Sequence, residues 1–145
     1  MSCVLRAVGA EFEVDAFLRC SRLSPLKVWR RGDRLGARAA PEQMLIEHEV
    51  AEKKYGQSGF AVVASAASFR DPVKQATDAA CFLRRHEPAL SQLAGCPGIE
   101  AILLDFGIED RPVEQQTNYF PPELLNLMGR LGIGLVVTRY PETAG

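Results

Sequence analysis

The sequence predicts an α+β fold, in which helices cover one face of a mainly antiparallel sheet. Two observations lead to this prediction: strand-like and helix-like segments are mixed along the chain, and they do not alternate strictly. Strict alternation would instead favour a doubly wound parallel sheet. A ferredoxin-like split βαβ core with additions is the simplest topology that accommodates these segments.

The chain has the size and composition of one folded domain. Of its 145 residues, 47% are hydrophobic and 24% are charged, which is ordinary for a globular protein. A domain of this length buries about 70% of the surface that its unfolded chain exposes, so it holds a core without disulfides or metals. We therefore expect a single α+β domain over residues 1–145.

The first segments of the chain are a strand and a short helix. Residues 2–8 form an apolar strand that Gly9 ends, and the spacing of Val14, Phe17 and Leu18 gives a helix one apolar face.

The next segments are strands separated by turns. Residues 27–31 predict a strand, 32–43 a loop, and 44–55 a strand whose pattern also fits a helix. Residues 57–59 predict a turn, so that 44–55 and 60–65 would form a hairpin.

Two helices follow. Asp71 suits a helix N-cap and Pro72 the first helical position. The buried stripe of this helix is expected to contain Val73, Ala76, Ala80 and Leu83. Pro88 separates it from a second, shorter helix, which carries Leu90 and Leu93.

The last segments are the clearest. Residues 99–108 alternate between apolar and mixed positions, as a strand with one buried face does. A helix begins at 121–123, and residues 133–140 form the final strand. The buried stripe of that helix consists of Leu124, Leu127, Met128 and Leu131.

The cysteines and the N-terminus indicate a reducing compartment. No basic segment followed by an apolar stretch begins the chain, and no apolar run reaches the length of a membrane span. We therefore expect a cytoplasmic protein that uses no membrane, metal or cofactor. Cys3 lies in an apolar strand pattern and Cys81 in an alanine-rich helix, where cysteine packs as a small hydrophobic residue. The cysteines are therefore expected to be buried structural thiols: Cys3, Cys20, Cys81 and Cys96.

Charge is distributed unevenly along the chain. Residues 19–38 hold seven basic side chains and one acidic one, a net charge of +6, whereas the remaining 10 basic and 17 acidic residues give −7. Six of the seven basic residues are arginines, which suit bidentate contacts with carboxylates. We refer to this stretch as the basic segment: Arg19, Arg22, Lys27, Arg30, Arg31, Arg34 and Arg38.

Two interpretations of the basic segment stay open. It is either a docking surface for an acidic partner protein, or a solvated rim that pairs with the chain's own acids at Glu11, Glu13, Asp15 and 109–114. Nucleic acid is a poorer partner because the pI is about 6.1. In the docking interpretation, Trp29 fills a pocket of the partner; otherwise it anchors the core. The expected partner-binding residues are Arg22, Lys27, Trp29, Arg30, Arg31 and Arg34.

A second set of polar residues suggests a small-ligand pocket. Asp105 lies between two apolar residues of the clearest strand, and Tyr119 and Arg139 are the polar groups expected to lie near it. No Gly-x-Ser-x-Gly motif or phosphate-binding loop is present, and Cys81 and His86 are rotated about 140° apart on their helix. The sequence therefore predicts no catalytic residues.

Several short motifs resemble a known family. Gly9 and Phe12 precede the first helix, a Trp-x-x-Gly-Asp motif begins at Trp29, and a Glu-Leu-Leu helix at Glu123 precedes a strand that ends in Tyr140. This pattern resembles the bacterial family called domain of unknown function 4279, over roughly residues 4–141, with a departure at 42–59. The resemblance implies a cytoplasmic bacterial α+β protein and no established activity.

Three functions are consistent with these features. The first is a non-enzymatic factor, immunity-type or regulatory, that binds an acidic partner protein through the basic segment around Trp29. The second is a small-ligand sensor or enzyme that uses the Asp105 pocket. The third is a structural homodimer, built by pairing an edge strand or by burying apolar surface near Trp29.

Overall fold

Five strands and four helices are present in the computed structural model, which describes residues 1–34 and 54–142. The strands are β1 (Cys3–Gly9), β2 (Lys27–Trp29), β3 (Ser58–Ser65), β4 (Ala101–Glu109) and β5 (Gly134–Tyr140). The helices are α1 (Val14–Cys20), α3 (Pro72–Arg85), α4 (Glu87–Ala94) and α5 (Pro122–Arg130). The α+β class is therefore confirmed.

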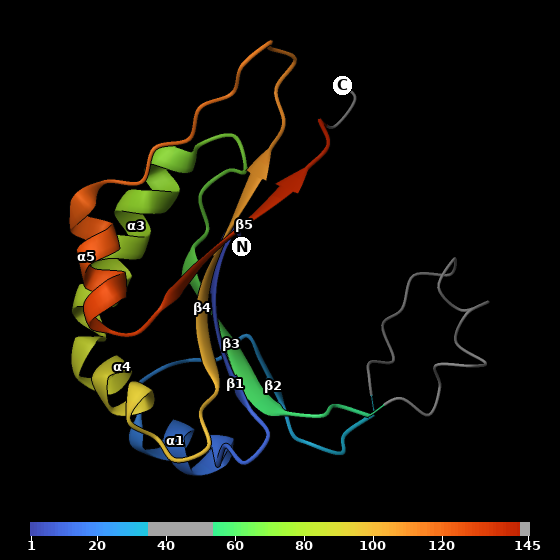
Figure 1. Cartoon of the computed structure of the whole chain (residues 1–145), viewed down its shortest axis with the longest axis vertical. Coiled ribbons are helices and arrows are strands. Elements are labelled where there is room, and N and C mark those ends of the chain that lie inside the picture. The colour runs from blue at the N-terminus through green and yellow to red at the C-terminus, as the bar shows by residue number, and fades with distance from the viewer. Residues whose placement is uncertain (35–53, 143–145) are drawn as a thin grey trace.

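The strands form one mixed sheet in the order β2-β3-β1-β4-β5 (Figure 1). Its neighbours are antiparallel except for β4 and β5, which are parallel and joined through α5. The expected mainly antiparallel sheet is thus confirmed. The split βαβ detail is not confirmed, because β4 and β5 are direct neighbours with no strand between them.

All four helices lie on one face of the sheet, and the core fills the space between them (Figure 1). Side chains alternate between the two faces of a strand, so every second residue of β1 and β4 enters this core. Leu5, Leu104 and Phe106 are fully buried there, and Phe17 of α1 stacks on Phe60 of β3. Among the described residues, no helix covers the other face, which we call the open face.

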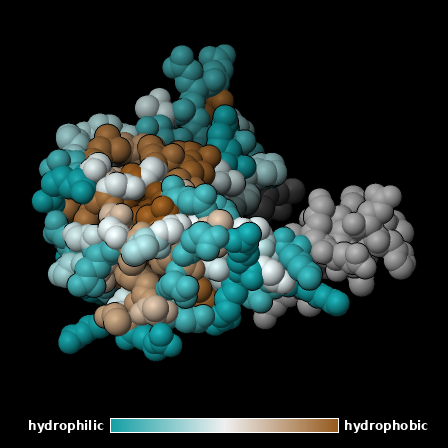
Figure 2. Space-filling view, turned by 60° about the horizontal axis from the view of Figure 1, so that its bottom comes forward, coloured by the Kyte–Doolittle hydropathy of each residue, from teal (hydrophilic) through white to brown (hydrophobic). Residues whose placement is uncertain are grey.

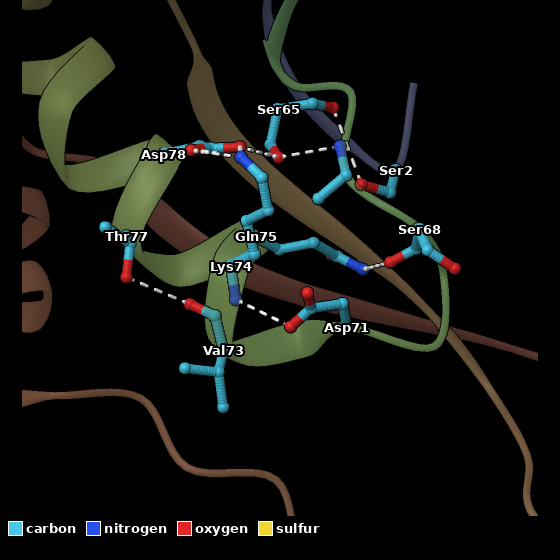
Figure 3. Close-up of polar contacts among 10 residues, drawn as sticks. Ser2, Ser65, Ser68, Asp71, Val73, Lys74, Gln75, Thr77 and Asp78 are labelled. Atoms are coloured by element: carbon cyan, nitrogen blue, oxygen red, sulfur yellow. Dashed lines mark hydrogen bonds and ion pairs between the residues drawn. The ribbon is translucent and has the colours of Figure 1, made fainter.

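The start of α3 is fixed by polar contacts as well as by packing (Figure 3). Asp71 is the N-cap, and its Oδ1 accepts a hydrogen bond from the Lys74 N–H at 3.0 Å. Ser65 at the end of β3 donates to Asp78 at 2.7 Å, which lowers the pKa of that carboxyl. These contacts join the end of β3 to the first turns of α3, and the helix begins where the Asp71–Pro72 signal predicts.

Two expectations about buried positions are wrong. Val73 is 73% exposed, because it lies in the first turn of α3 and the buried stripe begins with Gln75 and Ala76. Cys20 and Cys81 are also exposed, whereas Cys3 is buried. A small apolar residue on a helix is therefore not buried unless it lies on the stripe that faces the sheet.

The expected hairpin partner of β3 falls largely outside the described residues. Most of the predicted strand at 44–55 and most of the predicted loop at 32–43 lie there. Within the described residues β3 begins at Ser58, so Gly59 lies inside the strand and not in a turn. Its neighbours are β1 and β2.

Candidate functional site

A groove of about 400 Å³ lies on the open face beside β2. The strands position its lining because residues of one parity on β1, β2 and β3 all point to this face. Its lining residues, which define the Trp29 groove, are Val4, Arg6, Leu26, Lys27, Trp29, Tyr55 and Ala61. The groove therefore combines apolar, aromatic and cationic side chains.

Two aromatic rings form one wall of the Trp29 groove. The rings of Trp29 and Tyr55 stack with their centroids 5.8 Å apart. The Lys27 Nζ lies 5.9 Å from the Trp29 ring and 5.7 Å from the Tyr55 ring, within the range of a cation–π interaction. The ammonium group and the aromatic faces are thus held together before any partner binds.

Gly59 makes room for the Trp29 ring. The two residues are directly opposite in the β2/β3 register. A Cβ added at Gly59 would lie 2.8 Å from Trp29 Cζ2 and would also overlap the Ala7 carbonyl oxygen. The aromatic ring thus covers a glycine on the neighbouring strand, an arrangement that stabilises glycines in sheets.

An ion pair lies next to the groove in the middle of the open face. Arg6 donates to Asp105 Oδ2 at 2.7 Å, and the Thr138 hydroxyl donates to Asp105 Oδ1 at 2.7 Å. The Asp105 side chain is 12% exposed and that of Arg6 is 43% exposed. Both carboxylate oxygens of Asp105 therefore have a partner, and Arg6 is the more accessible member of the pair.

The structure divides the predicted partner-binding residues among several places. Lys27 and Trp29 line the Trp29 groove. Arg22 lines a different groove, beside Arg85 and His86 at the junction of α3 and α4. Arg34 pairs through its backbone with Lys54, and Arg38 lies outside the described residues.

Arg30 and Arg31 pair with acidic residues of the chain itself. Arg30 makes a bidentate contact with Asp15, at 2.8 and 2.6 Å, and Arg31 contacts Glu11 at 2.7 Å. The hydrogen bond from Arg30 lowers the pKa of Asp15. The solvated-rim interpretation therefore describes these two arginines, and the basic-segment cation that lines the Trp29 groove is Lys27.

The residues of the predicted small-ligand pocket do not come together. Asp105 is on the open face, whereas Arg139 is in register with Ile108, a core residue, and so points to the helix side of β5. Arg139 pairs with Asp110 at 2.7 Å. Tyr119 is 69% exposed in the segment before α5.

A second groove, of about 320 Å³, lies between α1 and the end of α4. Figure 2 brings this end of the molecule forward and shows hydrophobic surface framed by hydrophilic groups. Cys20 and Cys96 both line the groove, and burial raises the pKa of the Cys96 thiol. A raised pKa leaves less of the reactive thiolate, so Cys96 has the character of a packing residue.

Titratable groups elsewhere in the described part of the chain show no arrangement suited to metal binding. Within residues 1–34 and 54–142, no three His, Cys, Asp or Glu side chains gather as metal ligands. Burial and the neighbouring Arg85 lower the pKa of His86, which favours its neutral form. No helix in this part of the chain has the length and apolar character needed to cross a membrane.

Comparison with protein-family models, curated proteins and solved structures finds no match for the chain. The resemblance to domain of unknown function 4279 therefore stays a prediction. Only the geometry of the chain bears on its function.

Five of the seven residues that line the Trp29 groove were not predicted from the sequence. Lys27 and Trp29 were predicted, but Arg6 and Tyr55 were not, nor was Gly59 opposite Trp29. Arg6 could have been recognised from the sequence, since it is the one charged residue inside an otherwise apolar strand. Tyr55 and Gly59 could not, because their roles depend on the pairing of β2 with β3.

Proposed function

We propose that this chain is a non-enzymatic protein-binding factor whose docking surface is the Trp29 groove. The observation that carries the proposal is the aromatic pair of Trp29 and Tyr55 with the Lys27 ammonium over both rings. Rigid aromatic side chains with an adjacent charge are typical of the residues that dominate binding energy at interfaces. The proposed partner is an acidic protein.

Charge complementarity supports this choice of partner. Among the described residues, Lys27 has no carboxylate within ion-pair distance, and Arg6 keeps 43% of its side chain exposed despite its contact with Asp105. A carboxylate of the partner that approaches the groove thus meets two cations on one face. Leu26, which is 52% exposed at the rim, offers apolar contact beside them.

The neighbouring ion pair supports binding rather than acid–base chemistry. Asp105 accepts hydrogen bonds on both oxygens, from Arg6 and from Thr138. Both oxygens of this carboxylate are therefore engaged within the chain and are not free to contact a ligand. Its contribution is to orient Arg6 at the margin of the groove.

The test is affinity capture with matched variants. We expect a protein that is captured by the wild-type chain and by Arg111→Glu, an exposed charge reversal in another region, but lost with Lys27→Glu and with Trp29→Ala. The captured protein is then purified and titrated, and Trp29→Ala should weaken its binding about 30-fold or more. Circular dichroism checks that each variant is folded.

Trp29 is also a direct reporter, because it is the only tryptophan of the chain. Binding of the purified partner should change its fluorescence emission, and raising the salt concentration should reduce the association rate. Capture that is unchanged by Lys27→Glu and Trp29→Ala would overturn the proposal. So would a single-stranded DNA oligonucleotide that changes the emission as strongly as the captured protein does.

A further inference from the structure

The strand β5 forms one edge of the sheet and offers an unpaired row of backbone groups. The Tyr140 carbonyl accepts a hydrogen bond from the Asp110 N–H at 2.8 Å, so the backbone of Tyr140 faces β4. Successive residues of a strand direct their backbone groups to opposite sides, so those of Leu135, Val137 and Arg139 face outward. Within residues 1–34 and 54–142, no hydrogen bond reaches these outward groups.

This edge lacks the features that normally prevent pairing between sheets. Edge strands are commonly short, bulged, charged or interrupted by proline. The β5 strand is seven residues long, keeps a regular register with β4, and has Arg139 as its one charged residue. Leu135, Val137 and Tyr140 are 43, 39 and 46% exposed.

We infer that β5 pairs with β5 of a second copy of this chain, antiparallel, about a two-fold axis at Val137. This register places Val137 opposite Val137 of the second copy and Leu135 opposite Arg139. These three positions carry the outward backbone groups, so each opposed pair exchanges both of its hydrogen bonds. The sheets of the two copies then form one continuous sheet.

The side chains are complementary in the same register. Tyr140 falls opposite Gly134, which has no side chain to obstruct the second copy, and the Tyr140 ring keeps its edge-on contact with Phe69 of its own chain, with centroids 5.2 Å apart. Arg139 falls opposite Leu135 and not opposite itself, so no like charges meet, and its aliphatic stem packs along leucine. The one residue opposite itself is Val137, a β-branched residue suited to sheets.

The dimer does not depend on the Trp29 groove, which lies at the other end of the sheet. The first test is the mass in solution, measured by size-exclusion chromatography with light scattering. The wild-type chain and Leu125→Lys, a matched change at a residue 44% exposed on α5, should have the mass of two chains. Val137→Lys places two ammonium groups opposite each other and should have the mass of one.

A dimer that survives Val137→Lys, or a wild-type chain that is monomeric at every concentration measured, would overturn the inference. Circular dichroism of Val137→Lys separates dissociation from unfolding. The mass of Trp29→Ala should equal that of the wild type, so failure of the dimer and failure of the proposed docking surface are distinguishable.

The second test addresses the register. In a chain whose exposed Cys20 and Cys81 are replaced by serine, Val137→Cys should form a disulfide between two copies under mild oxidation. Opposed residues of a hydrogen-bonded antiparallel pair have Cα atoms about 5.5 Å apart, within the range of disulfides. Leu125→Cys in the same background is the control. Equal cross-linking of the two variants would contradict the proposed register.

Discussion

The two edges of the sheet differ in length, charge and composition. At one edge, β2 is three residues long, begins with the cation Lys27 and is followed by the cation Arg30. At the other edge, β5 is seven residues long and mostly apolar. The short edge offers little backbone for pairing, and its character comes from side chains. The long edge offers a regular row of backbone N–H and C=O groups, and most of its side chains are apolar.

This difference indicates two modes of recognition in one sheet. Side-chain surfaces such as the Trp29 groove discriminate between partners by charge and shape, and their association depends on salt. Backbone hydrogen bonds at a strand edge form with almost any sequence. The specificity of pairing at such an edge therefore comes from the register and the symmetry of the two strands. The partner we propose for the β2 edge is therefore a different protein, and the partner we propose for the β5 edge is a second copy.

The largest expected effect on stability distinguishes the backbone groups of β5 that face β4 from those that face outward. Val136→Pro removes an N–H that faces β4 and leaves a β4 carbonyl without its partner, so the free energy of unfolding should fall by about 3 kcal/mol. Val137→Pro removes an outward N–H and should lower it by less than about 1 kcal/mol. Urea unfolding in dilute solution, where a dimer contributes little, measures both. Equal losses would show that the assigned backbone directions are wrong.

The next effect compares Gly59, which lies under the Trp29 ring, with Gly134, which lies on the edge strand β5. Gly59→Ala brings a methyl group against the Ala7 carbonyl and the Trp29 ring, so we expect a loss of about 2 kcal/mol. At Gly134 the nearest atom to an added Cβ is Leu103 Cδ2 at 3.1 Å, the end of a flexible side chain. Gly134→Ala should therefore change stability by less than about 0.5 kcal/mol. Thermal unfolding measures both, and a neutral Gly59→Ala would contradict the close packing of Trp29.

The elements of this fold were predictable where the sequence is strongly periodic. Alternation in 99–108 and the Asp71–Pro72 signal match β4 and α3 within about two residues. The order of the strands was not predictable, since β1, β3 and β4 are all apolar and any of them suits the centre of a sheet. The position of Gly59 inside β3 was missed because a turn and a glycine under an aromatic ring look alike in sequence.

The candidate site was less predictable than the fold. The basic segment is a group of charges in the sequence, but the sequence does not tell which of its arginines pair within the chain. Arg30 and Arg31 do so because α1 brings Asp15 and Glu11 close to the end of β2. The contribution of Tyr55 depends on contacts between segments distant in sequence.

A smaller effect tests the cation of the β2 edge. Lys27→Met keeps the length and apolar stem of the side chain but removes the ammonium over Trp29 and Tyr55. We expect a loss of about 0.5 kcal/mol in the free energy of unfolding, as for other exposed cation–π contacts. Lys54→Met is the control, because Lys54 is exposed and does not line the groove. Equal effects of the two substitutions would indicate that Lys27 makes no specific contact with the rings.

The smallest expected effect concerns the ion pair beside β2. The hydrogen bond from Arg30 lowers the pKa of Asp15 below its ordinary value of about 3.9, so the charged carboxylate is favoured in the folded state. The pair therefore contributes to stability above about pH 4, and its contribution is lost as pH falls through the lowered pKa.

NMR titration of the Asp15 carboxyl carbon measures this shift directly. Arg30→Gln should raise the pKa of Asp15 toward its ordinary value, whereas Arg31→Gln, which alters the neighbouring pair with Glu11, should leave it unchanged. An Asp15 pKa that does not respond to Arg30→Gln would mean that Arg30 is not committed to Asp15. Its guanidinium would then join Lys27 among the cations that the β2 edge offers to a partner, and the two edges would differ in charge even more than the ion pairs now indicate.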